Sequence, residues 1–222
     1  MSDEICKTMK KLCKQNINGP YDGNVSFKAK CSDIVYISPG SVPKYSLKKK
    51  MINKIKIEKY SLDKKFEKEE KKYCYYYENS ELYYNRQHNT YLPSGEIKIH
   101  TNIINLLGNK HNKKDIAIIH CHPSNIIAYM GLETDNYREL QTIFILFPEL
   151  PKFIKIAPNV QHITARTEEL ADAITDNIKG FNFIGLHNHG IVCHAENFQK
   201  CIDMITTLDY YCGSALKYFN SI

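Results

Sequence analysis

Two short apolar segments of the chain each contain a pair of histidines separated by a single residue. His120 and His122 end the run DIAIIHCH, and His187 and His189 lie in the run FNFIGLHNHG. Such runs are typical of buried strands. Because side chains two residues apart on a strand point to the same face, each pair can direct two imidazoles to one point. A fold that uses both pairs must bring these two segments together.

The histidine pairs indicate a metal site. Imidazole is a common ligand of Zn²⁺, and a catalytic zinc has three protein ligands and an open fourth position. One H-x-H pair is weak evidence by itself, since most histidines are solvated or hydrogen-bonded, but two pairs in a chain of 222 residues favour a site. The pairs alone do not say which three of the four histidines bind. His100, four residues after Glu96, is expected at most in a supporting position.

Segments typical of strands alternate with segments typical of helices, which predicts an α/β domain with helices packed on a central sheet. The length suits a single domain over residues 1–222. We expect helices at residues 1–16, 92–109, 123–132, 135–148, 167–180 and 196–219. Strands are expected from about residue 24, and at 33–38, 74–85, 115–122 and 152–158, with two more around Gly190.

The net charge of +6 is concentrated in one segment. Residues 44–73 hold twelve lysines and five acidic residues, a balance of +7 that leaves −1 for the rest of the chain. Glutamates are mixed among the lysines, and no aromatic side chains are spaced for base stacking. We therefore interpret the segment at about 44–73 as a solvated, Lys-rich insertion and do not expect nucleic-acid binding.

The cysteines and the hydropathy pattern indicate a cytoplasmic protein. The eight cysteines are scattered, with no C-x-x-C pair, and are interpreted as reduced thiols. No run of about 18 apolar residues predicts a membrane span, and the first residues lack an apolar signal core. No membrane partner is therefore expected.

Several segments together resemble class II aldolases of the fuculose-1-phosphate aldolase type. That superfamily also includes ribulose-5-phosphate 4-epimerases, methylthioribulose-1-phosphate dehydratases and the adducin head domain. The resemblance rests on the order and spacing of six blocks, GNVSF at 23–27, ISPGSVPK at 37–44, LPSGEIKIH at 92–100, IIHCHPS at 118–124, IAP at 156–158 and LHNHGIVC at 186–193.

The resemblance implies a fold and a set of site residues. The fold would be a three-layer αβα domain whose central sheet is mostly antiparallel or mixed. Zn²⁺ would be held by His120, His122 and His189, with Glu96 as the catalytic carboxylate. His187 has no counterpart among the family's metal ligands and is expected nearby, either in a supporting position behind the ligands or in the wall of the pocket. The substrate phosphate would lie against Gly23, Asn24, Gly40, Ser41, Ser94 and Gly95. The family also implies a homotetramer with active sites between subunits.

These residues suit the reversible aldol cleavage of a small ketose 1-phosphate. The metal would act as a Lewis acid toward an enediolate, and glycine-rich turns would offer N–H and hydroxyl donors to a phosphate. A glutamate in a dry pocket can have its pKa raised toward working pH and move the proton on carbon.

Some positions depart from the family pattern and leave alternatives open. Gly95 stands where aldolases often have a second serine, so one hydroxyl is lost. The tyrosine that donates a proton in the family aldolase cannot be assigned among Tyr129, Tyr137, Tyr210, Tyr211 and Tyr218. A methylthioribulose-1-phosphate dehydratase shares the histidines and the glutamate. An epimerase would carry aspartate in place of Glu96, and an adducin-like interaction domain would lack the histidines.

Overall fold

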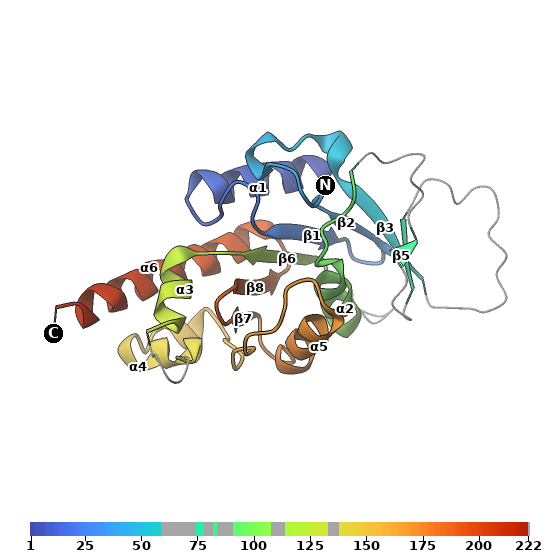
Figure 1. Ribbon diagram of the computed structural model, residues 1–222. Helices are drawn as coiled ribbons and strands as arrows, with labels where there is room; N and C mark the ends of the chain where they lie inside the picture. The colour runs from blue at the N-terminus through green and yellow to red at the C-terminus, as the bar shows by residue number, and fades with distance from the viewer. Residues whose placement is uncertain (59–73, 78–81, 84–90, 108–113, 133–137, 222) are drawn as a thin grey trace, which may run out of the picture.

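The computed structural model describes residues 1–58, 74–77, 82–83, 91–107, 114–132 and 138–221. Eight strands in these ranges form one sheet in the order β5-β4-β3-β2-β1-β6-β8-β7 (Figure 1). Neighbouring strands are antiparallel except for the β3–β4 pair, which is parallel. The strands are β1 (Asn24–Lys28), β2 (Ile34–Ile37), β3 (Asn53–Glu58), β4 (Cys74–Tyr77), β5 (Leu82–Tyr83), β6 (Ile116–Cys121), β7 (Phe183–Leu186) and β8 (Gly190–Ala195).

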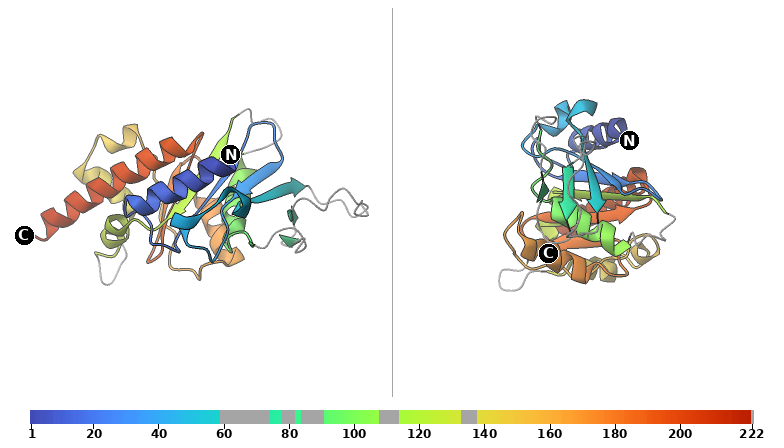
Figure 2. Two further views of the ribbon diagram at one scale, coloured as in Figure 1. Left: turned by 90° about the horizontal axis from the view of Figure 1, so that it is seen from above. Right: turned by 90° about the vertical axis from the view of Figure 1, so that its right-hand side faces the viewer.

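Helices cover both faces of the sheet, so the domain has three layers. The helices are α1 (Ser2–Lys14), α2 (Ile97–Leu107), α3 (Ser124–Met130), α4 (Ile143–Leu146), α5 (Glu168–Asn177) and α6 (Phe198–Phe219). Helices α1, α3 and α6 share one apolar core, and α2 and α5 share the other. The views from two sides show α1 with the long α6 on one face and α2 with α5 on the other (Figures 1 and 2). The predicted α/β fold with a mostly antiparallel, helix-flanked sheet is confirmed.

Strand β6 lies inside the sheet, between β1 and β8, and is buried throughout. Its side chains alternate, with Ala117 and Ile119 in the α1/α6 core and Ile116 and Ile118 in the α2/α5 core. This two-residue alternation is the geometry of a strand that is covered on both faces. His120 continues the series that faces α2 and α5.

The interpretation of the Lys-rich segment as solvated is wrong for its first part. Two 3-10 turns, Lys44–Ser46 and Lys49–Met51, precede β3, which pairs with β2. Lys44 is 2% exposed, and Ile55 is fully buried. The alternating pattern of Asn53–Glu58 suits a strand, and its apolar positions are recruited to the sheet despite the surrounding lysines. Residues 59–73 lie outside the described ranges.

Three other predicted elements are shorter than expected. The helix expected at 92–109 begins only at Ile97, because Pro93 forms a bridge with Pro39 and ties the preceding turn to another loop. The strand expected at 152–158 is reduced to a bridge between Ile156 and Phe183, since Pro158 lacks an N–H donor. The helix expected at 135–148 lies partly outside the described ranges and otherwise contains a 3-10 turn, Leu140–Thr142, and the one-turn α4.

None of the helices in the described ranges is both long enough and apolar enough to cross a membrane.

Candidate metal centre

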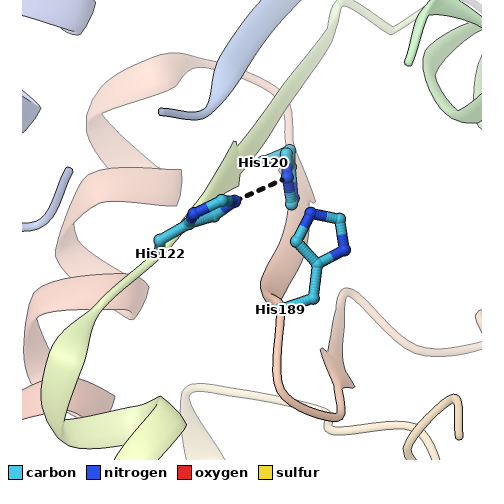
Figure 3. Close-up of side chains that lie close together, drawn as sticks. All are labelled: His120, His122 and His189. Atoms are coloured by element: carbon cyan, nitrogen blue, oxygen red, sulfur yellow. Dashed lines mark hydrogen bonds between the residues drawn. The ribbon is translucent and has the colours of Figure 1, made fainter. Parts of the chain in front are cut away.

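Three imidazoles converge where β6 ends beside the turn between β7 and β8. The rings of His120, His122 and His189 point toward one another (Figure 3). Their centroids lie 4.8–5.0 Å apart, with interplanar angles of 67–71°. One ligand nitrogen from each ring lies within 4.8 Å of the other two. The structure thus brings together the three histidines that the family resemblance implied.

His187 does not belong to this cluster, and it is not among the described residues that line the adjoining cavity, which leaves only the alternative of a supporting position. It is 1% exposed, and its Nε2 lies 3.4 Å from Nδ2 of Asn159. Strand β7 ends at Leu186, and Asn188 adopts a left-handed conformation with φ of 56°. The two-residue alternation of a strand therefore does not extend from His187 to His189, and the two rings point to different places.

Gly190 permits the close approach of the turn to β6. A Cβ atom at this position would lie 2.8 Å from the His122 ring and closer still to the carbonyl oxygen of Cys121. Both separations are far below van der Waals contact. A side chain here would push His189 and His122 apart, so the glycine is a geometric requirement of the cluster.

The donor set fits a metal ion such as Zn²⁺. Nδ1 of His120 donates to the carbonyl of Ile191 at 2.9 Å, which leaves the lone pair on Nε2. The Nε2 atoms of His120 and His122 are 3.1 Å apart, close to the roughly 3.4 Å expected between two imidazole ligands of a tetrahedral zinc. Burial, with repulsion from His120, lowers the pKa of His122 to about 3 and that of His189 to about 4. Neutral imidazole is the form that binds metal.

Glu96 faces the cluster with both carboxylate oxygens. Oε2 lies 3.3 Å from Nε2 of His120, and Oε1 lies 3.4 Å from Nε2 of His189. Burial alone would raise the pKa of Glu96, but His120, a hydrogen bond from Asn24 and His189 together lower it. The expected upward shift is therefore wrong for this structure, because burial brings the carboxylate next to groups that stabilise its charge. The group is ionised at neutral pH.

A buried chain of hydrogen bonds fixes Glu96. Nδ2 of Asn24 donates to Oε2 of Glu96 at 2.8 Å, and Oδ1 of Asn24 accepts from Nε2 of His100. Nδ1 of His100 then accepts from the Ser26 hydroxyl at 2.7 Å. Burial lowers the pKa of His100 to about 3, so its ring is neutral. The side chain of Asn24 thus positions the carboxylate and keeps one amide hydrogen for a ligand.

A cavity of about 700 Å³ adjoins the centre and gathers the other predicted residues. Glu96, His122 and His189 line it, together with all six residues expected at a phosphate, Gly23, Asn24, Gly40, Ser41, Ser94 and Gly95. Two of their backbone donors are already used. The N–H of Gly40 donates to Leu92 and that of Ser94 to Ser38, which ties the two loops to each other.

Sequence analysis missed two cations in this cavity, Lys44 and Arg166. Lys44 stood at the edge of a segment interpreted as solvated, and Arg166 precedes a helix without any motif around it. Burial lowers the pKa of Lys44 from 10.5 to about 8, while Cys13 and Asp22 oppose the shift. Its Nζ donates to the carbonyl of Pro39 at 2.7 Å.

Of the five tyrosines considered as proton donors, the four in the described ranges do not line the cavity. Tyr129 is 1% exposed and its hydroxyl lies 3.0 Å from Thr142 Oγ1. Tyr137 lies outside the described ranges. The remaining three are on α6 and absent from the cavity wall, which instead contains Tyr21 and Tyr91.

The metal-ligand assignment predicts different effects for neighbouring histidines. Replacing His120, His122 or His189 with Ala should lower the affinity for zinc at least tenfold, since each removes one of three ligands. His187→Gln should keep stoichiometric zinc and serves as the matched control. Elemental analysis after dialysis against zinc measures this. Loss of zinc in His187→Gln with retention in His189→Ala would reverse the assignment.

Lys44 should make the stability of the protein depend on pH in a specific direction. Its folded-state pKa of about 8 lies below its ordinary value of 10.5, so the unfolded chain holds the extra proton between these values. Stability should therefore rise with pH across this window. Relative to Lys44→Met, the wild type should gain roughly 2 kcal/mol of unfolding free energy between about pH 7 and 9.5.

Urea unfolding of both proteins at each pH measures this difference. A difference that stays constant over the same range would show that the ammonium group is not desolvated.

Comparison with known proteins agrees with this fold. Residues 3–216 match the family described as the class II aldolase and adducin N-terminal domain. A search of curated proteins found no match.

Solved structures share the fold at low identity. An L-fuculose 1-phosphate aldolase has 20% identity and a TM-score of 0.70, over 99% of this chain and 86% of that one. A sugar-phosphate aldolase from Thermotoga maritima has 17% identity and a TM-score of 0.71, over 99% and 94%. An L-fuculose-1-phosphate aldolase from Thermus thermophilus has 16% identity and a TM-score of 0.64, over 97% and 92%. Because the family match spans nearly the whole sequence, this chain belongs to the class II aldolase and adducin N-terminal domain family.

Proposed function

We propose that the protein is a zinc-dependent lyase that reversibly cleaves a small ketose 1-phosphate similar to fuculose 1-phosphate. The observation that carries the proposal is the position of Glu96 between two of three convergent imidazoles. Both of its oxygens lie within 3.4 Å of a ring nitrogen. A carboxylate beside a three-histidine site in a cavity suits acid–base chemistry on a carbon next to a carbonyl group.

Nε2 of His120 would hold the metal, together with one ring nitrogen from each of His122 and His189. Such an ion, when bound, would supply Lewis acidity to the oxygens of the substrate on which negative charge develops during cleavage. The three histidines leave a fourth position for the substrate. The lowered pKa values of His122 and His189 keep these two imidazoles neutral at physiological pH, so they do not need to lose a proton before the ion binds.

Glu96 would act as the acid–base group that removes a proton from the substrate and returns it. Its lowered pKa keeps it ionised, so it can accept a proton from substrate carbon or hydroxyl and return it in the reverse direction. Asn24 restrains one carboxylate oxygen, which keeps the base in a single orientation. The neutral His100 behind Asn24 supports this orientation without adding a charge to the site.

The substrate class is supported by the similar structures and by the cavity. The structures named above include aldolases of fuculose 1-phosphate and of sugar phosphates. In this chain, the loops expected at the phosphate share one cavity with the metal centre. A phosphorylated sugar could then reach both at once.

Replacing Glu96 with Gln tests the proposed role. Glu96→Gln keeps the shape and the contact with Asn24 but cannot accept a proton, so turnover of a cleavable ketose phosphate should fall about 10²–10⁴-fold. Zinc content should stay stoichiometric. Activity is followed by triose phosphate release, in a screen of ketose 1-phosphates with zinc present.

The products separate the lyase from other outcomes. Two fragments support aldol cleavage, whereas one product that retains all carbons indicates a dehydratase. Unchanged turnover in Glu96→Gln would remove the glutamate from the mechanism. No turnover of any ketose phosphate by the zinc-loaded wild type would contradict the proposed lyase.

We further propose a homotetramer with active sites between subunits. Large apolar side chains are exposed at Ile145, Phe153 and Tyr210, to 82%, 64% and 70%, which supports a contact surface. Light scattering should give about four times the chain mass of 25.8 kDa. A monomer would contradict this arrangement.

A further inference from the structure

Two cations, Lys44 and Arg166, line the cavity. Within the described ranges neither Lys44 nor Arg166 forms an ion pair. The cavity also contains the carboxylates of Asp22 and Glu96. Glu96 is engaged by Asn24 and the histidines, and Asp22 lies against Gly19 in its own turn. Lys44 is buried, and a desolvated cation without an ion pair is costly, which favours an anionic ligand beside it. Arg166 is exposed, so its guanidinium group is accessible to a ligand that enters the cavity.

Arg166 occupies the space that a side chain at position 95 would need. A Cβ atom on Gly95 would lie 2.9 Å from Cδ of Arg166 and 3.3 Å from its Nε. The arginine stem therefore packs directly on the glycine. A serine at position 95 and this placement of Arg166 exclude each other, unless the arginine moves.

The loop that carries Arg166 is held in place where it enters α5. Arg166 itself has a φ of 68°, a left-handed conformation that is uncommon for a residue with a side chain. Thr167 caps α5 by accepting from the N–H of Leu170 at 3.2 Å. An ion pair between Lys98 of α2 and Glu168 of α5 fastens the start of α5 to the helix that follows Gly95. The left-handed residue thus lies directly before an anchored helix start, and such uncommon conformations are frequent at binding sites.

Lys44 presents its charge from the wall of the same cavity. One of its three ammonium hydrogens is donated to Pro39, which leaves two for a ligand. The neighbouring loops add neutral donors. No acceptor in the described part of the chain pairs with the N–H of Ser41 or of Gly95. The Ser94 hydroxyl accepts from the N–H of Glu96 and still has a hydrogen to donate.

We propose that Lys44 and Arg166 form the anion-recognition end of the cavity and select a dianionic phosphomonoester, with Arg166 replacing the hydroxyl that is lost at Gly95. This proposal rests on the proposed function, because it assigns the phosphate of that substrate. Two cations with the donors of Ser41, Ser94 and Gly95 match the three oxygens and the double charge of a terminal phosphate. A substrate with a hydroxyl in that place would leave both cations unpaired.

Binding of inorganic phosphate to the zinc-loaded protein tests this assignment without turnover. Calorimetry should show that Arg166→Gln weakens phosphate binding about tenfold, as expected for the loss of one charge-assisted contact. Lys179→Gln removes an exposed lysine that is not among the residues lining the cavity and should leave the affinity unchanged. Zinc content and thermal unfolding establish that each variant is folded.

A double-mutant cycle between positions 95 and 166 tests the proposed exchange of residues more directly. Gly95→Ser should weaken phosphate binding in the wild-type background, because the new side chain displaces Arg166. The same substitution should strengthen binding in Arg166→Ala, where the space is free and the serine adds a hydroxyl. A reversal of sign supports the exchange of residues. Equal effects in both backgrounds, or unchanged affinity in Arg166→Gln, would overturn it.

The outcomes also distinguish this proposal from the lyase assignment. Phosphate binding that depends on Arg166, in a protein that cleaves no ketose phosphate, supports the anion site and contradicts the lyase. Cleavage of a ketose phosphate with an unchanged KM in Arg166→Gln supports the lyase and overturns the role of Arg166. Absence of phosphate binding by the wild type overturns the anion site.

Discussion

The close contact between the end of β6 and the turn before β8 is the constraint on which the candidate site depends. Antiparallel pairing sets His120 opposite Val192, and the absence of a side chain at Gly190 lets the turn approach His122. His189, the residue before that glycine, then faces the two histidines of β6. A small shift of one strand against the other would separate the three rings, because the sheet fixes them through its register.

The candidate site also requires that the buried polar groups beside this contact form hydrogen bonds. Asn24, Ser26 and His100 lie in an otherwise apolar layer between β1 and α2, where each unpaired group would cost about 1–3 kcal/mol. Their hydrogen bonds run in one direction, from the serine hydroxyl through the ring and the amide to Glu96. The network therefore satisfies the buried groups and aims the carboxylate with the same contacts. Fold stability and site geometry are coupled at these positions.

The sequence alone predicted the features that depend on local residue patterns and on the order of motifs along the chain. The short continuous apolar run of β6 predicted a buried strand, and the six blocks led to the class, the three histidines and the surroundings of the cavity. The predictions that were wrong concern residues whose positions depend on contacts between segments that are distant in the sequence. Lys44 was taken for a solvated residue because its neighbours are lysines, whereas packing buries it against α1 and the Pro39 loop. His187 was placed on the ligand face by strand periodicity, which a single left-handed residue at Asn188 interrupts.

Arg166 shows why a lost motif residue need not mean a lost interaction. From sequence, glycine at position 95 removes a hydroxyl from a loop and leaves a gap in the expected donor set. In three dimensions the gap is filled by a side chain from 71 residues farther along the chain, in contact with that glycine. The replacement also changes the type of interaction with a ligand, because a guanidinium adds a full positive charge where a hydroxyl adds a neutral donor. Recognition at that end of the cavity then depends on the charge of the ligand as well as its shape. A chain with this pair of residues should discriminate a phosphate from a neutral group more strongly than one that relies on two serines.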